Sequence, residues 1–142
     1  TKDLLTKCLP YHPFIIKPNH HELGEIFGVT IETEEQIVDY AKKLQEMGAR
    51  NVLISRGGDG AMLITGTGEV YTSNVPKGTL VNSVGAGDSM LSGFMAKFIE
   101  TKDYAASLKQ GAATGSATAF SVGIAEKSFI EELIPQVVVK KL

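Results

Sequence analysis

The stretch LVNSVGAGDSMLSGFMAKF, from Leu80 to Phe98, places two glycines and an acid between an apolar segment and an amphipathic helix. A glycine-rich turn that enters a helix leaves backbone N–H groups without intrahelical partners, and the helix dipole adds partial positive charge there. Such a turn can bind phosphate. Gly85 and Gly87 would give the backbone the freedom that a close approach to an anion requires.

The acid of this stretch, Asp88, has two interpretations on the local pattern alone. A carboxylate cannot bind phosphate without a bridging cation, so Asp88 would stand beside the phosphate to accept the proton of an attacking hydroxyl. Alternatively, it is an acid favoured in the first turn of a helix, and the glycines serve only the turn. We expect the helix to span residues 88–99, with an inward face made of Leu91, Phe94, Met95 and Phe98.

The bulk properties limit the classes of function. The chain has 142 residues and 43% hydrophobic content, enough for one domain or one piece of a domain. Its formal charge of -2, without a long basic run, argues against nucleic acid or an anionic membrane as the main partner. The single cysteine, Cys8, excludes an internal disulfide and favours a cytoplasmic location. The longest uncharged run, residues 110–125, is too short and too polar to span a bilayer.

Helical and strand patterns alternate along the chain, which predicts an α/β fold. The helix that begins after Thr33 has the clearest signals, because Thr33 and Gln36 can form a capping box and Gly48 can end the helix. The further helices are expected at residues 1–9, 20–27, 105–120 and 128–134, and the strands at residues 14–17, 51–55, 61–65, 69–75 and 136–142.

Several well-known functional motifs are missing from the sequence. A dinucleotide-binding fingerprint would need glycine at position 90, which is Met90. No Walker A loop, G-x-S-x-G, H-E-x-x-H or paired C-x-x-C occurs, so the hydrolase and zinc-site interpretations lack support. The neighbouring His20 and His21 would point in different directions on a helix, which disfavours a His-pair metal site.

The stretch VNSVGAGDS (81–89) resembles the signature of the ribokinase-like, or PfkB, family of sugar kinases. Three further stretches match in the family's order. KPNHHE (17–22) resembles its N-x-x-E motif, SRGGDGAML (55–63) its nucleotide loop S/T-x-G-x-x-G, and GAATGSATAFSVG (111–123) the helix and loop beside the adenine. The resemblance implies a three-layer α/β/α fold with a mainly parallel sheet, of which this chain would be the single C-terminal, nucleotide-binding portion.

The same resemblance implies roles for individual residues. Asp88 would be the catalytic base, and the N–H groups of Gly85, Ala86 and Gly87 would form an anion hole for the transferred phosphoryl group. ATP would contact Ser55, Gly57, Gly58, Gly60, Gly87 and Ser116. Asn19 and Glu22 would organise Mg²⁺ through water, because Mg²⁺ dehydrates reluctantly. Taken alone, the RGGDG loop would be a hairpin turn, and Glu22 a surface acid.

Details of the motifs resemble two groups within the family. Asn82-Ser83 in place of Asp-Thr, IKPN (16–19) and GSATAFS (115–121) are similar to 1-phosphofructokinases and to tagatose-6-phosphate kinases. A 1-phosphofructokinase would make fructose 1,6-bisphosphate from fructose 1-phosphate and ATP. A tagatose-6-phosphate kinase is the alternative, and a non-catalytic nucleotide-binding fragment is a third possibility. Family members have an N-terminal half with the lid and most sugar contacts. Without it, we expect this chain to be inactive and to self-associate as a homodimer or larger species through an exposed sheet edge.

Overall fold

The computed structural model describes residues 2–78, 80–81, 85–121 and 125–142. The chain divides into two compact units. The first comprises residues 1–56, 62–71 and 142, and the second comprises residues 57–61 and 72–141. Each unit has a hydrophobic core of its own.

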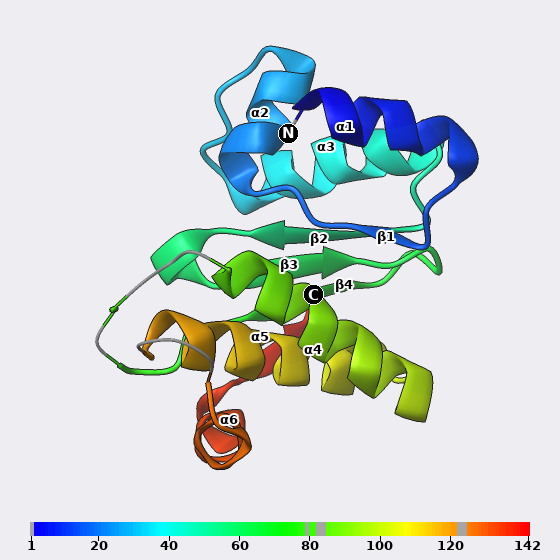
Figure 1. Ribbon diagram of the computed structural model, residues 1–142. Helices are drawn as coiled ribbons and strands as arrows, with labels where there is room; N and C mark the ends of the chain where they lie inside the picture. Colours follow the sequence, from blue (N-terminus) through cyan, green and yellow to red (C-terminus); the bar gives the residue numbers. More distant parts are fainter. Residues whose placement is uncertain (1, 79, 82–84, 122–124) are drawn as a thin grey trace. The chain divides into compact units, whose positions relative to one another are not determined.

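The first unit contains three helices that cover one face of its strands (Figure 1). The helices are α1 (Lys2–Cys8), α2 (His20–Phe27) and α3 (Glu34–Glu46), and the first two strands are β1 (Ile15–Ile16) and β2 (Asn51–Ser55). A short 3-10 turn, Leu9–Tyr11, follows α1. Strands β1 and β2 are parallel. The expected capping box of α3 is confirmed, since the Thr33 hydroxyl accepts from the Gln36 N–H at 3.1 Å and the Gln36 side chain accepts from the Thr33 N–H at 3.0 Å.

The next two strands, β3 (Ala61–Ile64) and β4 (Val70–Ser73), form an antiparallel hairpin closed by a bond from the Thr65 N–H to the Glu69 carbonyl, 2.9 Å. Strand β3 lies beside β2 and runs in the opposite direction (Figure 1). The sheet is therefore mixed, with β1 and β2 as its parallel pair. Its order places the ends of β1 and β2 side by side, and the N-x-x-E and nucleotide-loop motifs follow these ends.

Buried Asn51 joins separate segments of the first unit. Its side-chain amide donates to the Phe14 carbonyl at 2.8 Å, and its side-chain oxygen accepts from the Gly66 N–H at 2.9 Å. Asn51 is 1% exposed, so water cannot replace either bond. The Asn51 side chain therefore hydrogen-bonds both the residue before β1 and the turn between β3 and β4.

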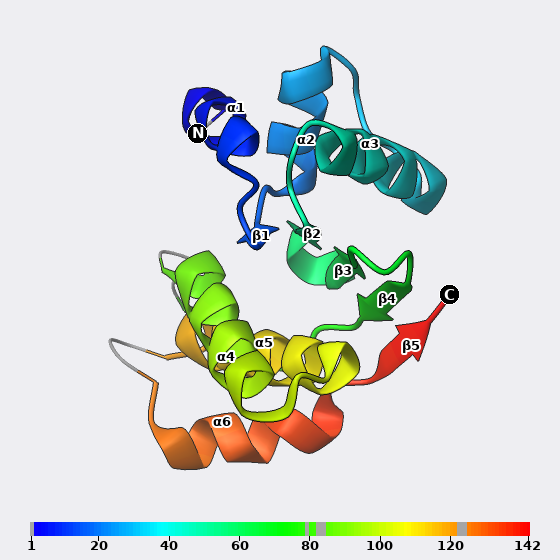
Figure 2. The same ribbon diagram turned by 90° about the vertical axis from the view of Figure 1, so that its right-hand side faces the viewer.

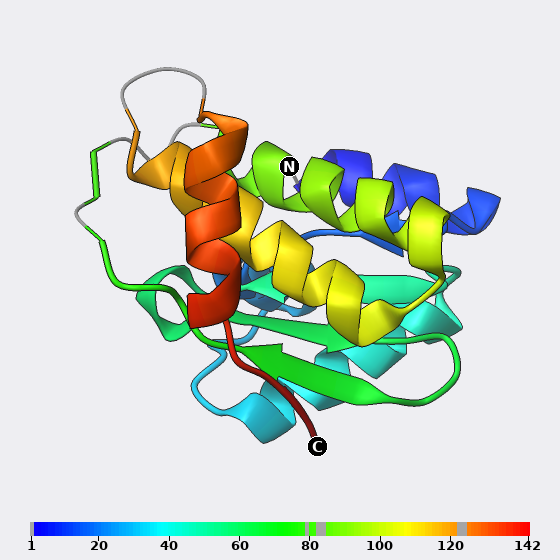
Figure 3. The same cartoon turned by 90° about the horizontal axis from the view of Figure 1, so that it is seen from below.

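The second unit is built on an antiparallel pair of helices, α4 (Ala86–Thr101) and α5 (Tyr104–Ala119). It also contains α6 (Lys127–Leu133), a 3-10 turn at Ile134–Gln136 and β5 (Val139–Lys141), and α6 packs beside α5 (Figures 2 and 3). Helices α4 and α5 approach closely through glycines. A Cβ added to Gly93 would lie 2.5 Å from the Thr114 hydroxyl, and one added to Gly111 would lie 2.8 Å from the Met90 carbonyl oxygen.

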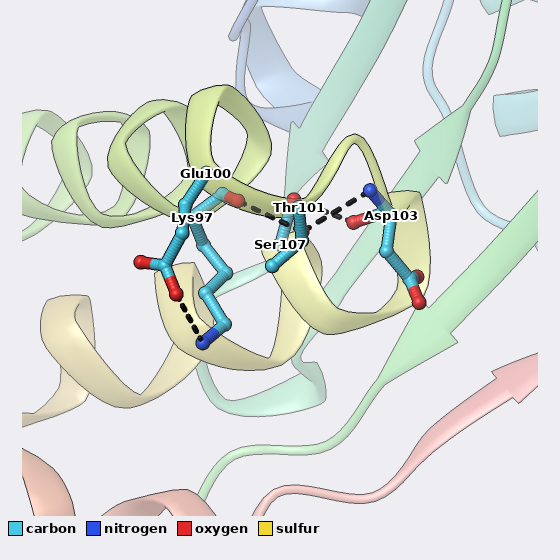
Figure 4. A network of polar contacts seen from close by, with 5 residues as sticks. All are labelled: Lys97, Glu100, Thr101, Asp103 and Ser107. Carbon is cyan, nitrogen blue, oxygen red and sulfur yellow. Dashed lines mark hydrogen bonds and ion pairs between the residues drawn. The ribbon is translucent and has the colours of Figure 1, made fainter.

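The corner between α4 and α5 is held by local polar contacts (Figure 4). The Thr101 hydroxyl donates to the Lys97 carbonyl at 2.8 Å and accepts from the Asp103 N–H at 3.2 Å. The Ser107 hydroxyl then donates to the Asp103 carbonyl at 2.6 Å. Lys97 and Glu100 form an ion pair across one turn of α4, 3.7 Å. These contacts fix the turn at the end of the pair that is remote from Asp88.

The helices and strands expected from the sequence are confirmed, with differences at their ends. Helix α4 begins at Ala86, two residues before the expected start, because Gly85 adopts the left-handed conformation (φ 83°) and is itself the N-cap. None of the helices among the described residues is both long enough and apolar enough to cross a membrane.

Candidate functional site

The first turn of α4 presents backbone donors without intrahelical partners. Its first helical hydrogen bond runs from the Ser89 N–H to the Gly85 carbonyl, 2.9 Å, so the N–H groups of Ala86, Gly87 and Asp88 have no acceptor within the helix. No side chain caps this end at Gly85. Among the described residues, a Cβ at Gly85 would meet no atom within 4 Å, so a ligand has room to approach. The turn therefore fits an anion such as a phosphoryl group.

Asp88 is exposed in this same turn. Among the described residues, its carboxylate forms no hydrogen bond or ion pair and makes no return bond to the N-cap. An acid at this position in a capping box would accept from the N-cap N–H. Asp88 makes no such bond, which leaves its carboxylate available to a ligand beside the helix terminus.

The last turns of α5 lie against this helix terminus. A Cβ added to Gly115 would be 3.0 Å from the Ala86 carbonyl oxygen, and the neighbouring Ser116 is half-buried. The structure thus brings Ser116 to the same end of the helix pair as Asp88. The Asn82-Ser83 pair and residues 122–124, on which parts of the resemblance depend, lie outside the described residues.

The glycines of the nucleotide-loop motif play two different roles. After β2 the chain forms a 3-10 turn, Gly57–Asp59, in which Gly57 and Gly58 are exposed and a Cβ on either would meet nothing within 4 Å. Gly60 is buried with φ +91°, and its Cβ would lie 1.8 Å from the Ser73 carbonyl oxygen. The first two glycines leave space for a ligand, whereas Gly60 is required by the packing.

Asn19, Glu22 and Ser55 come together in the first unit. Asn19 forms a parallel bridge with Ser55, and the Ser55 N–H donates to the Pro18 carbonyl at 3.3 Å. Both residues therefore lie where the parallel strands β1 and β2 end, which is the edge at which open α/β sheets bind ligands. Lys17, two positions before Asn19, is half-buried.

The N-x-x-E motif forms a capping box at the start of α2. The Glu22 N–H donates to the Asn19 side-chain oxygen at 2.8 Å, and the Asn19 N–H donates to the Glu22 carboxylate at 3.1 Å. The sequence contains this signal, since Asn followed three positions later by Glu is a recognised helix start. The family resemblance implies a different role for the two residues, beside the metal. The local fold alone accounts for both residues.

The capping box still permits the expected water-mediated contact with Mg²⁺. Each carboxylate or amide oxygen has a second lone pair, so an oxygen that accepts one N–H can also accept from a metal-bound water. The described residues contain no group of three or more His, Cys, Asp or Glu side chains that could hold a metal ion. The oxygens of Asn19 and Glu22 fit a cation that keeps its water ligands.

The expected site residues fall into two groups, one in each unit. The first unit holds Asn19, Glu22 and Ser55, and the second holds Gly57, Gly58, Gly60, Gly85, Ala86, Gly87, Asp88 and Ser116. In the first unit, the end of the parallel strands lies next to the Glu22 carboxylate and the Ser55 hydroxyl. In the second unit, the N–H groups at the start of α4 lie next to the Asp88 carboxylate. This combination is suited to binding a phosphorylated ligand and to removing a proton beside it.

Residues 1–130 match the pfkB family carbohydrate kinases. The 1-phosphofructokinase of Bacillus subtilis is 48% identical over 140 residues, which cover 99% of this chain. The D-tagatose-1-phosphate kinase of Bacillus licheniformis is 37% identical over 140 residues, which cover 98% of this chain. The chain spans 46% of the length of each of these relatives.

The fold is shared with a candidate phosphofructokinase from Staphylococcus aureus whose crystal structure is known. That structure superposes with a TM-score of 0.94 at 36% identity and covers 99% of this chain and 45% of its own chain. The expected ribokinase-like α/β class is thereby confirmed. The tagatose phosphate kinase among these relatives is named for the 1-phosphate, whereas the sequence resemblance suggested the 6-phosphate.

Proposed function

The chain belongs to the PfkB family of carbohydrate kinases, and from that membership we propose that it supplies the nucleotide site, anion hole and catalytic base of a sugar-phosphate kinase. The reaction is that of a 1-phosphofructokinase, in which fructose 1-phosphate and ATP give fructose 1,6-bisphosphate and ADP. The first turn of α4 carries the proposal, because it combines N–H groups that lack helical acceptors, among them those of Ala86 and Gly87, with the exposed carboxylate of Asp88.

Each residue of the turn has a distinct role in this proposal. Phosphoryl transfer needs alignment and stabilisation of charge more than covalent help. The N–H groups of Gly85, Ala86 and Gly87 hold the oxygens of the transferred group, with the helix dipole adding to their effect. The Asp88 carboxylate accepts the proton of the sugar hydroxyl as its oxygen forms the new bond to phosphorus and the bond to ADP breaks.

The nucleotide and the metal are assigned to the other three family motifs of the chain. Ser55, Gly57 and Gly58 border the phosphates or ribose of ATP, while Ser116 borders the base side. Gly60 contacts no ligand in this proposal; its close packing against the Ser73 backbone holds the loop in place. Mg²⁺, when bound, neutralises charge on the phosphates. Asn19 and Glu22 hold it through water, using oxygens that also cap α2.

The chain is proposed to be the C-terminal, nucleotide-binding portion of a longer cytoplasmic kinase. It matches under half of the length of its relatives, so most sugar contacts are assigned to the remainder of the protein. On that basis the 142-residue chain alone is expected to be inactive. The exposed free thiol of Cys8 is compatible with a reducing compartment.

A second substrate, a tagatose phosphate, has specific support. A D-tagatose-1-phosphate kinase is 37% identical to this chain, against 48% for the 1-phosphofructokinase. Both sugars are ketohexose phosphates, so the residues proposed here would serve either. The higher identity favours fructose 1-phosphate, and selection between the sugars is assigned to the part of the protein outside this chain.

The experiment is a steady-state kinase assay on the full-length protein with fructose 1-phosphate, tagatose 1-phosphate and tagatose 6-phosphate as acceptors. We expect the highest kcat/KM with fructose 1-phosphate. Asp88→Asn should lower kcat on the order of 10²–10⁴-fold while leaving the affinity for ATP within a few-fold. A parent protein that phosphorylates none of the three sugars, or an Asp88→Asn variant with nearly normal kcat, would refute the proposal.

A further inference from the structure

A hydroxyl pair joins the first turn of α4 to the last turn of α5. The Thr118 hydroxyl lies 2.8 Å from the Ser89 hydroxyl, although the two residues are 29 positions apart in the sequence. Ser89 directly follows Asp88, and its N–H makes the first hydrogen bond of α4. Both side chains are half-buried, so the contact is shielded from exchange with water more than a surface pair would be.

Thr118 makes a second contact with its hydroxyl. Its hydroxyl also lies 3.1 Å from the Thr114 carbonyl oxygen, which can only accept. The Thr118 hydroxyl donates to the Ser89 hydroxyl over the shorter distance, 2.8 Å, and shares its one proton with the Thr114 carbonyl at 3.1 Å. The Ser89 side chain is thus the acceptor of a bond that comes from α5.

A second bond attaches the chain on the other side of the glycine turn to the next residue of α5. The Val81 N–H donates to the Ala119 carbonyl at 2.8 Å. Adjacent residues at the end of α5, Thr118 and Ala119, therefore contact Ser89 and Val81. The proposed anion hole and Asp88 directly precede Ser89 in the sequence. The Gly115 contact with the Ala86 carbonyl oxygen, 3.0 Å from an added Cβ, places the helices too close for another side chain to intervene.

We propose that Thr118 is a positioning residue, which acts through Ser89 to hold the first turn of α4, and with it Asp88, in the geometry required for proton transfer. The inference rests on the proposed function for the role of Asp88 and on the structure for the bond itself. Alignment of reacting groups is sensitive to displacements of about 1 Å, which can cost 10²-fold in rate. A single hydroxyl bond at the base of the turn is well placed to prevent such a displacement.

Thr114 shows that not every hydroxyl on this face of α5 does the same. Its hydroxyl donates to the Gln110 carbonyl at 2.8 Å within α5, and its neighbour on α4 is Gly93, which has no side chain to accept a bond. Thr114 and Thr118 thus share residue type, helix face and back-bonding, but only Thr118 has a polar side-chain partner on α4 among the described residues. Thr114 is therefore a matched control.

The experiment compares Thr118→Val, Thr118→Ser, Ser89→Ala and Thr114→Val in the full-length protein. Amide hydrogen exchange without ligand should become about five-fold faster at residues 89–91 in Thr118→Val and Ser89→Ala, which is the factor expected from the loss of one hydrogen bond. Both variants should also lose about ten-fold in kcat with the KM for ATP within two-fold. Thr118→Ser should restore both values, and the double variant should be no worse than either single one.

The two readouts separate this inference from the proposed function. Three results would overturn the positioning role. The first is unchanged amide exchange at residues 89–91 in Thr118→Val, and the second is faster exchange spread evenly over α4 and α5. The third is a loss of kcat in Thr114→Val equal to that in Thr118→Val. The parent protein could lack kinase activity while amide exchange at residues 89–91 still rises in Thr118→Val and returns to the parent rate in Thr118→Ser. In that case the hydroxyl bond holds this turn, and the kinase assignment is wrong.

Discussion

Asn19 and Glu22 exchange hydrogen bonds in both directions, side chain to backbone, at 2.8 and 3.1 Å. A pair of residues expected to serve a cation is thus also the device that starts a helix. The two functions make different demands on the side chains. Capping needs only an acceptor at each position, whereas attraction of a hydrated cation gains from the negative charge of Glu22.

Removing the Asn19 side chain should lower the free energy of unfolding. Asn19→Ala deletes the acceptor for the Glu22 N–H, and we expect a loss of about 1 kcal/mol in the free energy of unfolding. Asn19→Asp and Asn19→Ser keep an acceptor and should lose less than half of that amount. Urea denaturation followed by far-ultraviolet circular dichroism would measure the differences. Equal stability of Asn19→Ala and the parent would mean that the cap contributes nothing.

Glu22→Gln separates the cap from the charge. The amide oxygen of Gln can still accept from the Asn19 N–H, so the free energy of unfolding should stay within about 0.5 kcal/mol of the parent. If Glu22 helps to hold Mg²⁺, the concentration of Mg²⁺ for half-maximal kinase activity should rise several-fold. A Mg²⁺ titration of initial rates at saturating ATP checks this. An unchanged titration curve would assign Glu22 to the helix alone.

The glycines of the loop after β2 should differ sharply in their tolerance of alanine. Gly60→Ala combines a φ of +91° with a Cβ 1.8 Å from the Ser73 carbonyl oxygen, and we expect it to lose at least about 3 kcal/mol. Gly57→Ala meets no atom and carries only the left-handed penalty, about 1 kcal/mol. Denaturation midpoints of the two variants give the comparison. Similar losses for both would contradict the two roles assigned here.

Asn51 should be among the residues least tolerant of substitution in the first unit. Asn51→Ala leaves the Gly66 N–H without its partner in a buried site and leaves the Phe14 carbonyl with only the bond from the Asn51 backbone N–H, at a cost of about 2–3 kcal/mol. Asn51→Asp should cost at least as much, because a carboxylate cannot donate to the Phe14 carbonyl. Thermal unfolding of both variants measures this. An Asn51→Asp variant as stable as the parent would show that the amide donor is not needed.

The 142-residue chain on its own should self-associate. Several large apolar side chains are more than half exposed, among them Leu80 at 66%, Val138 at 53% and Leu142 at 67%. Exposed apolar surface of this kind favours association. Sedimentation velocity over a range of concentrations should show a species larger than the monomer. A compact monomer at every concentration would be evidence against this expectation.

Much of the fold was predictable because its signals are local. The Thr33–Gln36 capping box and the glycine that follows α3, Gly48, are read from neighbouring residues, and the structure confirms both. The start of α4 was missed by two residues because glycine at an N-cap gives no side-chain signal. Here the conformation of Gly85 decides the boundary.

The candidate site was only partly predictable, because several of its contacts depend on tertiary packing. No local pattern indicates that Gly60 lies against Ser73, or that Ser89 meets Thr118 across 29 positions. The separate roles of Gly57 and Gly60 likewise emerge only when the neighbours of each are known. The roles taken from family resemblance for Asp88 and Ser116 remain predictions.

The contrast between the exposed glycines and Gly60 has a consequence for how this loop can change over generations. If Gly57 and Gly58 border the nucleotide as proposed, selection for catalysis acts on them, while selection for a folded chain acts on Gly60 whether or not any nucleotide is bound. A descendant that had become a pseudokinase would therefore be expected to lose the first two glycines and retain the third. Survival of that last glycine would then be a poor sign of activity.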